Sequence, residues 1–385
     1  MKALQFDRKP LRIAAAFMAG SVAPGRGAAW GPLELIDDDD PALPTDEWVR
    51  LRPRLSGICG SDLATIDARS SRYFEPIVSF PFTLGHEVVA ETADGRRVVI
   101  VPVLSCVTRG IDPVCDMCAA GRINLCERVA FGHLSPGLQT GFCADTGGGW
   151  STSMVAHPSQ IVAVPDDLSD EAAVMLEPTA CAVHAAARDT GEHTVIIGAG
   201  TLGLLTLAAM ATRREQRGGT PAPIIVTAKY AEQKRLAKEL GADVVCAPDE
   251  LPRWVRRLSG SLAVGNQLTC GFNHVVDCVG TSDSIDQALK IAAPGGEVLL
   301  VGMPAKVTLE LTGLWHRETA IRGCYAYERA DFDTAIDVVR RFDLGRLVSA
   351  TYPLRRYKDA LEHAASAGRR GAVKVAFDMR AEKRR

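Results

Sequence analysis

The second half of the chain alternates short apolar strands with helices, and this alternation restricts the fold more than any other feature. The apolar run Val195–Ile197 leads into the turn Gly198-Ala199-Gly200-Thr201-Leu202-Gly203, which opens a helix. Further strand patterns lie at 224–227, 244–245, 275–277 and 297–301, with a helical pattern at 231–240. Alternation of this kind predicts a parallel sheet covered by helices.

The glycine-rich turn has the flanks that a dinucleotide-binding turn needs. Its glycines allow a tight turn and a close backbone approach, so a pyrophosphate can bind at the helix N-terminus. A six-residue glycine pattern alone arises by chance, and it is the strand before and the helix after that carry the prediction. The candidate cofactor-binding residues here are Gly198, Gly200, Thr201, Leu202 and Gly203.

The end of the second strand of this region bears on cofactor choice. NAD-specific sites usually place an acid there, but this chain has Ala228 and then Lys229. The missing acid removes repulsion of a 2′-phosphate, and Lys229, with Lys234 or Arg235, could supply the counter-charge. We therefore expect NADP to be favoured. The alternative is that Lys229 is a solvated loop lysine and that either cofactor is accepted.

The first half of the chain has a different texture. Residues 1–164 hold short alternating runs, such as Arg97–Val101, broken by Gly, Pro and Asp, which is typical of irregular β structure. A helix at 331–342 and a strand at 373–377 are expected to return to this part. We predict an α/β protein with a β-rich domain (1–165 and 320–385) and a doubly wound parallel-sheet domain (166–319).

Composition argues against several classes of partner. The formal charge of the 385 residues is −2 with both signs interspersed, so we expect neither a nucleic-acid nor a membrane partner. The start of the chain lacks the features of a signal peptide, and a cytoplasmic protein is expected. Eleven cysteines are too dilute for a disulfide scaffold, and their clustering indicates metal thiolates in a reducing compartment.

One cysteine cluster predicts a closed metal site. Cys115, Cys118 and Cys126 supply three thiolates on one lobe, and Cys106 can complete an all-sulfur tetrahedral shell. Asp112 is the alternative fourth ligand, since two residues separate it from Cys115, as two residues separate Cys115 from Cys118. A closed shell leaves no room for a substrate, so this zinc would be structural.

A second set of residues predicts an open metal site. Cys59, His86, Glu87 and Glu177 offer one thiolate, one imidazole and two carboxylates. If the fold brings them together, they make a zinc site with a free position, and an open site is a catalytic one.

The motifs together resemble those of the zinc-containing medium-chain dehydrogenase/reductase family. The resemblance rests on Cys59-Gly60-Ser61-Asp62, Gly85-His86-Glu87, the four-cysteine lobe, Glu177-Pro178, the nucleotide turn and Ile321–Tyr327. Within the family, the chain is more similar to the sorbitol, threonine and glucose dehydrogenase branches than to liver-type alcohol dehydrogenases, because Glu177 stands where the latter have a second cysteine. The resemblance implies a GroES-like catalytic domain, a Rossmann domain, a cleft between them, and assembly as homodimers or homotetramers.

The resemblance also implies roles for single residues. Cys59 and His86 would bind the catalytic zinc, with Glu87 or Glu177 as an exchangeable third protein ligand. Ser61 would take the proton of the alcohol, and Asp62 would orient His86 or cap the helix that begins there. Many relatives carry a histidine three residues after that serine, where this chain has Ala64, which leaves the proton path beyond Ser61 open.

The expected activity is hydride transfer between a nicotinamide cofactor and an alcohol or polyol, or its carbonyl partner, with zinc as a Lewis acid. A zinc-free type of enone or quinone reductase and a non-catalytic redox sensor are the alternatives. The substrate depends on the pocket, which the aromatic residues of 70–82 and Trp150 could line; the alternative is that these residues are ordinary core.

Overall fold

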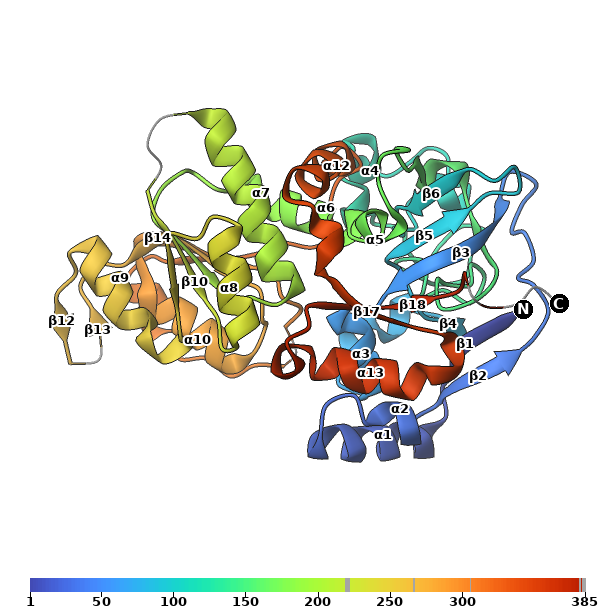
Figure 1. Cartoon of the computed structure of the whole chain (residues 1–385), viewed down its shortest axis with the longest axis horizontal. Coiled ribbons are helices and arrows are strands. Elements are labelled where there is room, and N and C mark those ends of the chain that lie inside the picture. Colours follow the sequence, from blue (N-terminus) through green and yellow to red (C-terminus); the bar gives the residue numbers. More distant parts are fainter. Residues whose placement is uncertain (219–221, 266, 305, 381, 383–385) are drawn as a thin grey trace. The chain divides into compact units, whose positions relative to one another are not determined.

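The structure, a computed structural model, describes residues 1–218, 222–265, 267–304, 306–380 and 382 (Figure 1). The chain divides into two units: unit 1 comprises Met1–Glu177 with Tyr327–Arg385, and unit 2 comprises Pro178–Ala326. These divisions fall somewhat later in the chain than the domain boundaries predicted from sequence texture. One reason is that helix α6 (Leu176–Ala186) begins just before the first division and continues past it.

Unit 2 is built on a six-stranded parallel sheet with the strand order β11-β10-β9-β14-β15-β16. Its strands are β9 (Thr194–Ile197), β10 (Ile224–Thr227), β11 (Val244–Cys246), β14 (Phe272–Asp277), β15 (Ala292–Leu300) and β16 (Ala320–Gly323). The order reverses between β9 and β14, which is the doubly wound Rossmann arrangement. The predicted parallel sheet is therefore confirmed.

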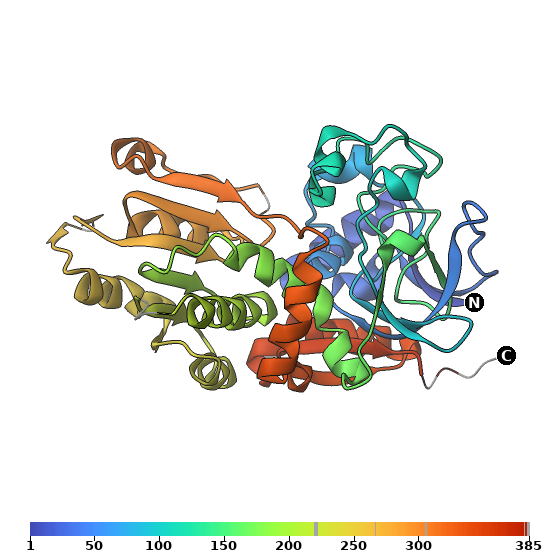
Figure 2. The ribbon, with the colours of Figure 1, turned by 90° about the horizontal axis from the view of Figure 1, so that it is seen from above.

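Helices accompany the strands of this sheet, as Figure 2 shows from above. They are α7 (Thr201–Arg217), α8 (Ala231–Glu239), α9 (Leu251–Ser259), α10 (Ser282–Ile291) and α11 (Thr312–His316). Two short strands, β12 (Ala263–Val264) and β13 (Gln267–Leu268), form a hairpin. Every residue of β9 and β10 is buried, as expected for central strands covered on both faces.

Unit 1 contains a larger, mainly antiparallel sheet and a small one. The larger sheet runs β17-β18-β3-β5-β6-β8, with β7 also pairing with β3, and the small sheet runs β2-β1-β4. The strands are β1 (Lys2–Phe6), β2 (Leu33–Asp37), β3 (Val49–Gly57), β4 (Phe82–Thr83), β5 (Val88–Glu91), β6 (Arg97–Ile100), β7 (Met154–Ala156), β8 (Ile161–Ala163), β17 (Val348–Tyr352) and β18 (Lys374–Asp378). Short strands joined by loops agree with the predicted irregular β structure.

The helices of unit 1 include several that the sequence texture did not predict. They are α1 (Pro10–Val22), α2 (Gly27–Trp30), α3 (Gly60–Ile66), α4 (Asp116–Ala119), α5 (Asp170–Ala173), the start of α6, α12 (Asp331–Phe342) and α13 (Tyr357–Ala365). The prediction of irregular β structure was wrong for α1 and α2, which lie between β1 and β2. The missed signal is Pro10 at the first helical position, followed by a run rich in alanine, a strong helix former.

The C-terminal strand β18 positions part of the site described below. It pairs antiparallel with β3, so that Ala376 lies opposite Gly57. This pairing brings the start of β18 to the end of β3, where the loop to α3 begins. Phe377 of β18 packs against Trp150 in the core of unit 1, with ring centroids 4.9 Å apart.

Candidate active site and metal centres

The beginning of α3 fixes the position of Cys59. Cys59 is the N-cap of this helix, and the Asp62 carboxylate accepts a hydrogen bond from its backbone N–H at 2.9 Å. This reciprocal capping satisfies backbone donors that a helix start otherwise leaves unpaired. Asp62 is fully buried, so the cap also holds a negative charge inside the protein next to Cys59.

His86 lies in the segment between β4 and β5 and faces the same carboxylate. Its Nδ1 atom is 3.4 Å from Asp62 Oδ1, and both side chains are buried. Burial lowers the pKa of His86, but the Asp62 carboxylate and Cys59 outweigh it and hold the pKa well above its ordinary value. With Nδ1 directed to Asp62, the other ring nitrogen is left to bind a ligand, as in metal-bound histidines.

Cys59, His86 and Glu87 form one cluster. Each offers a ligand atom, and the three ligand atoms lie within 4.8 Å of one another. His86 Nδ1 and Asp62 Oδ1 are buried without a well-formed hydrogen bond, a costly arrangement for polar groups. One sulfur, one ring nitrogen and one carboxylate oxygen are the donors that Zn²⁺ prefers, so the residues present fit this ion.

Glu87 also pairs with a lysine that the sequence did not suggest. Lys374 Nζ lies 2.6 Å from Glu87 Oε1 and 2.5 Å from Oε2, and both side chains are buried. Burial lowers the pKa of Lys374, but Glu87 raises it above its ordinary value. The sequence signal for this pair was Lys374 itself, which begins the mainly buried strand β18. A buried cation requires an acidic partner, so a lysine at this position indicates a nearby carboxylate.

Gly57 makes room for this pair. A Cβ atom at Gly57 would lie 1.8 Å from Glu87 Oε2, so any other residue would displace the carboxylate. The backbone carbonyl of Gly57 accepts a hydrogen bond from Trp150 Nε1 at 3.1 Å. A glycine before the Cys59 motif is therefore required by the packing of the cluster.

Glu177, the other predicted carboxylate, is not among the three clustered residues. It is buried near the start of α6, and the Tyr327 hydroxyl donates a hydrogen bond to its Oε1 at 2.9 Å. Burial raises the pKa of Glu177 to about 7, with His86 opposing this rise and Glu87 adding to it. Glu177 is thus a carboxyl group that can gain or lose a proton near neutral pH.

Ser61 lies in the first turn of α3, two residues after Cys59, and is half-buried. The Thr65 hydroxyl donates to its carbonyl oxygen and lies 2.9 Å from the Ser70 hydroxyl. Ala64, on the same helix, has no group that can carry a proton.

Two of the aromatic residues that the sequence offered as pocket walls lie in the core, and a third is exposed. Phe82 and Trp150 belong to the buried core of unit 1, and Tyr73 is exposed. For Phe82 and Trp150, the interpretation as ordinary core is correct. Phe142, which the sequence did not indicate, lies beside His86 with ring centroids 6.0 Å apart.

The four cysteines of the lobe lie together. The sulfur atoms of Cys106, Cys115, Cys118 and Cys126 are within 4.8 Å of one another, with Cys106 and Cys126 3.6 Å apart. Asp112, the alternative fourth ligand, is not in this group. Although burial raises the pKa of Cys115, nearby backbone N–H groups lower it to about 7, which favours the thiolate. Four sulfurs at this spacing fit a closed Zn²⁺ shell.

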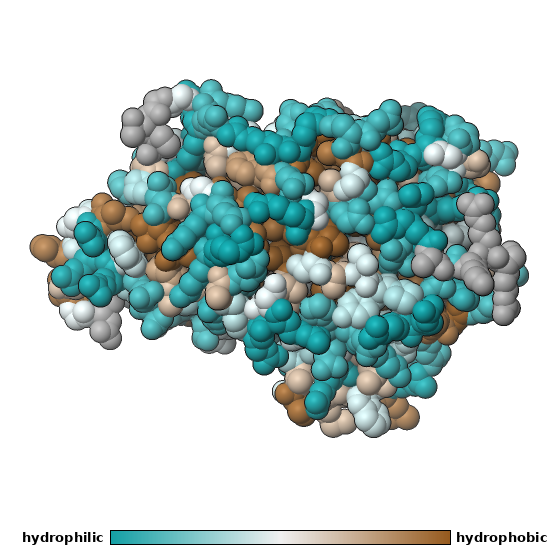
Figure 3. All heavy atoms as spheres, in the orientation of Figure 1, coloured by the Kyte–Doolittle hydropathy of each residue, from teal (hydrophilic) through white to brown (hydrophobic). Residues whose placement is uncertain are grey.

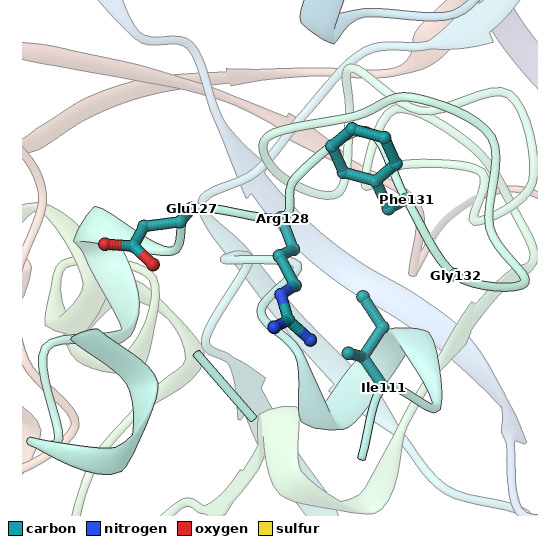
Figure 4. A pocket seen from close by; sticks show the side chains of 5 residues that line it. All are labelled: Ile111, Glu127, Arg128, Phe131 and Gly132. Carbon is teal, nitrogen blue, oxygen red and sulfur yellow. The ribbon is translucent and has the colours of Figure 1, made fainter. Parts of the chain in front are cut away.

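A pocket beside this lobe contains none of the proposed metal ligands. It is lined by Ile111, Glu127, Arg128, Phe131 and Gly132, and the Arg128 side chain extends toward Ile111 (Figure 4). Arg128 also donates a hydrogen bond to the carbonyl of Pro113 at 3.0 Å.

The nucleotide turn of unit 2 has the backbone form that a bound pyrophosphate needs. Gly198 has a φ of +95°, and its N–H donates to the Thr227 hydroxyl at 2.9 Å. A Cβ atom at Gly203 would lie 1.8 Å from the Gly198 carbonyl, so the helix can pack this closely only with glycine there. Gly200 is the N-cap of α7, and Thr201 and Leu202 form its first turn, so the free N–H groups of this helix lie at the turn.

The residues considered for a 2′-phosphate differ in their availability. Ala228 is buried at the end of β10, and Lys229 is exposed directly after it. Arg235 forms ion pairs with Glu232 and Glu239 on α8. These two acids compete for Arg235, which leaves Lys229 as the better-placed cation.

Comparisons with known proteins agree with this geometry. Residues 45–166 match the alcohol dehydrogenase GroES-like domain, and residues 217–341 match the zinc-binding dehydrogenase domain. The chain is 29% identical to L-idonate 5-dehydrogenase of Vitis vinifera, over 86% of this chain and 88% of that protein. It is 30% identical to a "Putative D-xylulose reductase" of Agrobacterium fabrum, over 79% of this chain and 83% of that protein.

A solved structure shares the fold. It is that of a "putative zinc-binding dehydrogenase" from Sinorhizobium meliloti 1021 bound to NADP, with a TM-score of 0.71, 23% identity and coverage of 98% of each chain. Within the described residues, no helix combines the length and apolar character of a membrane span. The two domain matches and the relative at 30% identity show that this chain is an oxidoreductase of the zinc-containing medium-chain dehydrogenase/reductase family.

Proposed function

We propose that the chain oxidises a polyol or a related alcohol, or reduces the corresponding carbonyl compound, with zinc and with NADP favoured over NAD. The observation that carries the proposal is the cluster of Cys59, His86 and Glu87. The relatives named for L-idonate and D-xylulose support a polyol substrate. The neighbour solved with NADP, and Lys229 in place of an acid, support the cofactor.

Three residues would hold the catalytic zinc. Cys59 and His86 would be permanent ligands. Glu87, which forms an ion pair with Lys374, would be an exchangeable ligand. When bound, the ion supplies Lewis-acid stabilisation of negative charge on the substrate oxygen, and the nicotinamide gives or takes the hydride. Asp62, whose carboxylate lies 3.4 Å from His86 Nδ1, would orient the imidazole so that its other nitrogen is left for the ion, as second-layer carboxylates do in metal sites. Lys374 balances the charge of Glu87 inside the protein.

Ser61 and Glu177 are the candidates for handling the proton. Ser61 lies two residues from Cys59 and carries a hydroxyl group that can pass a proton on. Glu177, hydrogen-bonded to Tyr327, has a pKa raised to about 7 and can serve as an acid or a base near neutral pH. We assign Ser61 the first transfer and Glu177 the exchange with solvent. Glu177 as an alternative third ligand belongs to the same proposal.

The remaining parts of the proposal concern the scaffold. A second zinc would bind Cys106, Cys115, Cys118 and Cys126 and would be structural. We propose that the β-rich domain predicted at 1–165 and 320–385 is the catalytic domain and that the parallel-sheet domain predicted at 166–319 is the coenzyme domain. Strand β16 (Ala320–Gly323), which pairs with β15, is counted with the coenzyme domain. We also propose that the protein assembles as a homodimer or homotetramer and that it is cytoplasmic.

The deciding experiment compares two cofactors and then a set of substrates on one sample. The dissociation constants of NADPH and NADH are measured by fluorescence titration. Turnover is then measured on polyols, sugars, and aliphatic and aromatic alcohols, and on the corresponding carbonyl compounds. Tighter NADPH binding with zinc-dependent turnover of a polyol is the expected result. Tighter NADH binding would make Lys229 a bystander.

The alternatives predict other outcomes of the same experiment. Turnover of enones or quinones that survives removal of zinc would indicate the zinc-free type of reductase. Cofactor binding without turnover of any compound would indicate a redox sensor. Either result would overturn the proposed reaction.

A further inference from the structure

Two hydroxyl groups lie together at the end of α3, one turn beyond Ser61. The Thr65 hydroxyl donates a hydrogen bond to the Ser61 carbonyl at 2.9 Å and lies 2.9 Å from the Ser70 hydroxyl. Ser61 and Thr65 are four residues apart on one helix, so their side chains share a face, with Cβ atoms about 5–6 Å apart. One water molecule, with two hydrogen bonds of about 2.8 Å, can bridge hydroxyl groups at such a separation.

The chain folds back after α3, and this turn brings Ser70 to Thr65. Ala68 has a φ of +53°, a left-handed conformation that a residue with a Cβ atom rarely adopts. The N–H groups of Arg69 and Ser70 then both donate to the Ala64 carbonyl, at 2.7 and 3.2 Å. Backbone strain of this kind persists only where the surrounding structure fixes it, and it is frequent at functional sites.

Helix α1 and the segment that joins it to α2 fix this turn from outside. The buried Asp67 carboxylate accepts hydrogen bonds from the N–H groups of Gly25 and Gly27 at 2.8 and 2.9 Å. Arg69 donates to the carbonyl of Gly20 in α1 at 2.8 Å. Helix α1 lies at the surface, and Figure 3 shows brown and tan residues along the edge where α1 lies in Figure 1. The turn after α3 is therefore held in place on both of its sides.

The hydroxyl pair lies between the interior and the surface. Ser61, Thr65 and Ser70 are all half-buried, and Arg69 beside Ser70 is exposed. The Thr65 hydroxyl has one hydrogen, which it donates to the Ser61 carbonyl, so the Ser70 hydroxyl donates to Thr65 in this arrangement. Both hydroxyl groups can rotate about their C–O bonds. Rotation reverses the direction of donation, so that Thr65 donates to Ser70 and Ser70 donates to solvent.

We propose that Thr65 and Ser70 carry the proton between Ser61 and the solvent, in place of the histidine that Ala64 does not supply. In alcohol oxidation the substrate hydroxyl gives its proton to Ser61, and Ser61 gives its own to a bridging water molecule. The water passes a proton to Thr65, Thr65 passes one to Ser70, and Ser70 passes one to bulk water. Each oxygen of this chain ends with as many hydrogens as it began with, while the substrate loses one proton and one hydride. In carbonyl reduction every step reverses.

The inference rests on the proposed function, because the relay needs the proton of an alcohol to carry. It adds a second route from Ser61 beside the exchange assigned to Glu177. Glu177 lies on α6 and accepts a hydrogen bond from Tyr327, whereas the hydroxyl route stays within α3 and the turn after it. We expect the hydroxyl route to carry most of the protons, because Thr65 is already hydrogen-bonded both to Ser70 and to the backbone of Ser61.

Thr65→Val tests the relay, because valine resembles threonine in shape and lacks the hydroxyl group. The rate of a single turnover with the best alcohol should fall by about 10-fold, a modest part of what proton transfer contributes in enzymes. Single turnovers are measured so that product release does not hide the proton step. The KM of the substrate and the zinc content should stay unchanged, and Ser70→Ala should lower the same rate. Thr212→Val is the matched control and should keep the rate, since the Thr212 hydroxyl also donates to the carbonyl four residues earlier, at 3.0 Å.

A rescue separates a relay from a structural role of Thr65. Ala64→His supplies an imidazole that can carry the proton, so Ala64→His combined with Thr65→Val should restore the wild-type rate. A packing defect caused by the valine would not be repaired in this way, so a lowered rate without rescue would overturn the inference. An unchanged rate in Thr65→Val would also overturn it and leave the proton to Glu177. If the wild type turns over no alcohol or carbonyl compound, the proposed function itself fails and the relay falls with it.

Discussion

The metal cluster of unit 1 and the nucleotide turn of unit 2 are built in opposite ways. The cluster draws on residues from separate parts of the chain: Cys59 and Asp62, His86 and Glu87, and Lys374. The turn is one contiguous segment, Gly198 to Gly203, that acts through its backbone. The cluster therefore depends on buried charges held by the fold, whereas the turn depends on local backbone shape and is adjusted by side chains at its margin.

The largest effect is expected from Cys59→Ser, which attacks the cluster directly. Loss of a zinc ligand removes several kcal/mol of stabilisation of the developing charge, so kcat/KM should fall by about 10³-fold. Zinc content, measured by mass spectrometry, should drop by one ion per chain. Cys270→Ser, at an exposed cysteine, is the matched control and should keep both values. Retained turnover in Cys59→Ser would remove the zinc mechanism.

Cys118→Ser tests whether the second set of thiolates is purely structural. The lobe has little core besides its sulfur atoms, so losing the ion should cost about 3–5 kcal/mol of unfolding free energy. Limited proteolysis should then cut between residues 106 and 132. Cys143→Ser, at a buried cysteine outside both clusters, should cost less. Equal losses in the two variants would show that the lobe does not need its metal.

Lys374→Met tests the dependence of the cluster on buried charge. Removing one partner of a buried ion pair leaves an uncompensated charge and costs about 3 kcal/mol or more. Urea denaturation of Lys374→Met and of the double variant with Glu87→Gln measures this. We expect the double variant to be more stable than Lys374→Met alone, because no buried charge is left unpaired. If it is less stable, Lys374 acts through packing and not through charge.

The difference between a contiguous turn and a cluster assembled from separate segments also explains which parts the sequence could predict. The strand, turn and helix around Gly198–Gly203 were predicted correctly because these residues are adjacent in the chain and their flanking patterns are clear, whereas their role in cofactor binding stays a prediction. The cluster was predicted in part: Cys59, His86 and Glu87 stand in short motifs, but Lys374 becomes relevant only through the pairing of β18 with β3. Helix α1 was missed because both of its faces carry apolar residues, with Ala16 buried and Leu11 and Met18 exposed, so the sequence lacks the usual alternation of an apolar and a polar face.

Ala228→Asp tests the cofactor preference, because it changes one side chain at the end of β10 and leaves the backbone of the nucleotide turn intact. An acid there repels a 2′-phosphate and accepts hydrogen bonds from the ribose hydroxyls of NAD. The ratio of NADPH to NADH affinity should fall by about 10-fold or more, which is about 1.4 kcal/mol. Ala228→Asn controls for size without charge and should change the ratio less. An unchanged ratio in Ala228→Asp would place the 2′-phosphate elsewhere.

The smallest effect concerns a buried histidine of unit 2 that takes no part in either site. His274 of β14 is buried, its Nε2 has no hydrogen-bond partner, and burial lowers its pKa. Its folded-state pKa is therefore below the unfolded value, the unfolded chain binds the proton more readily, and stability falls as the pH drops below about 6.5. The loss is at most about 1.4 kcal/mol per pH unit for one proton. Denaturation at pH 5 and pH 7.5 should show His274→Gln losing less stability on acidification than the wild type, while the exposed His316→Gln should behave as the wild type. If His274→Gln is equally acid-sensitive, the pH dependence arises from other groups, such as the buried Asp189 of unit 2, whose pKa is lowered because its ion pair with Arg214 outweighs burial.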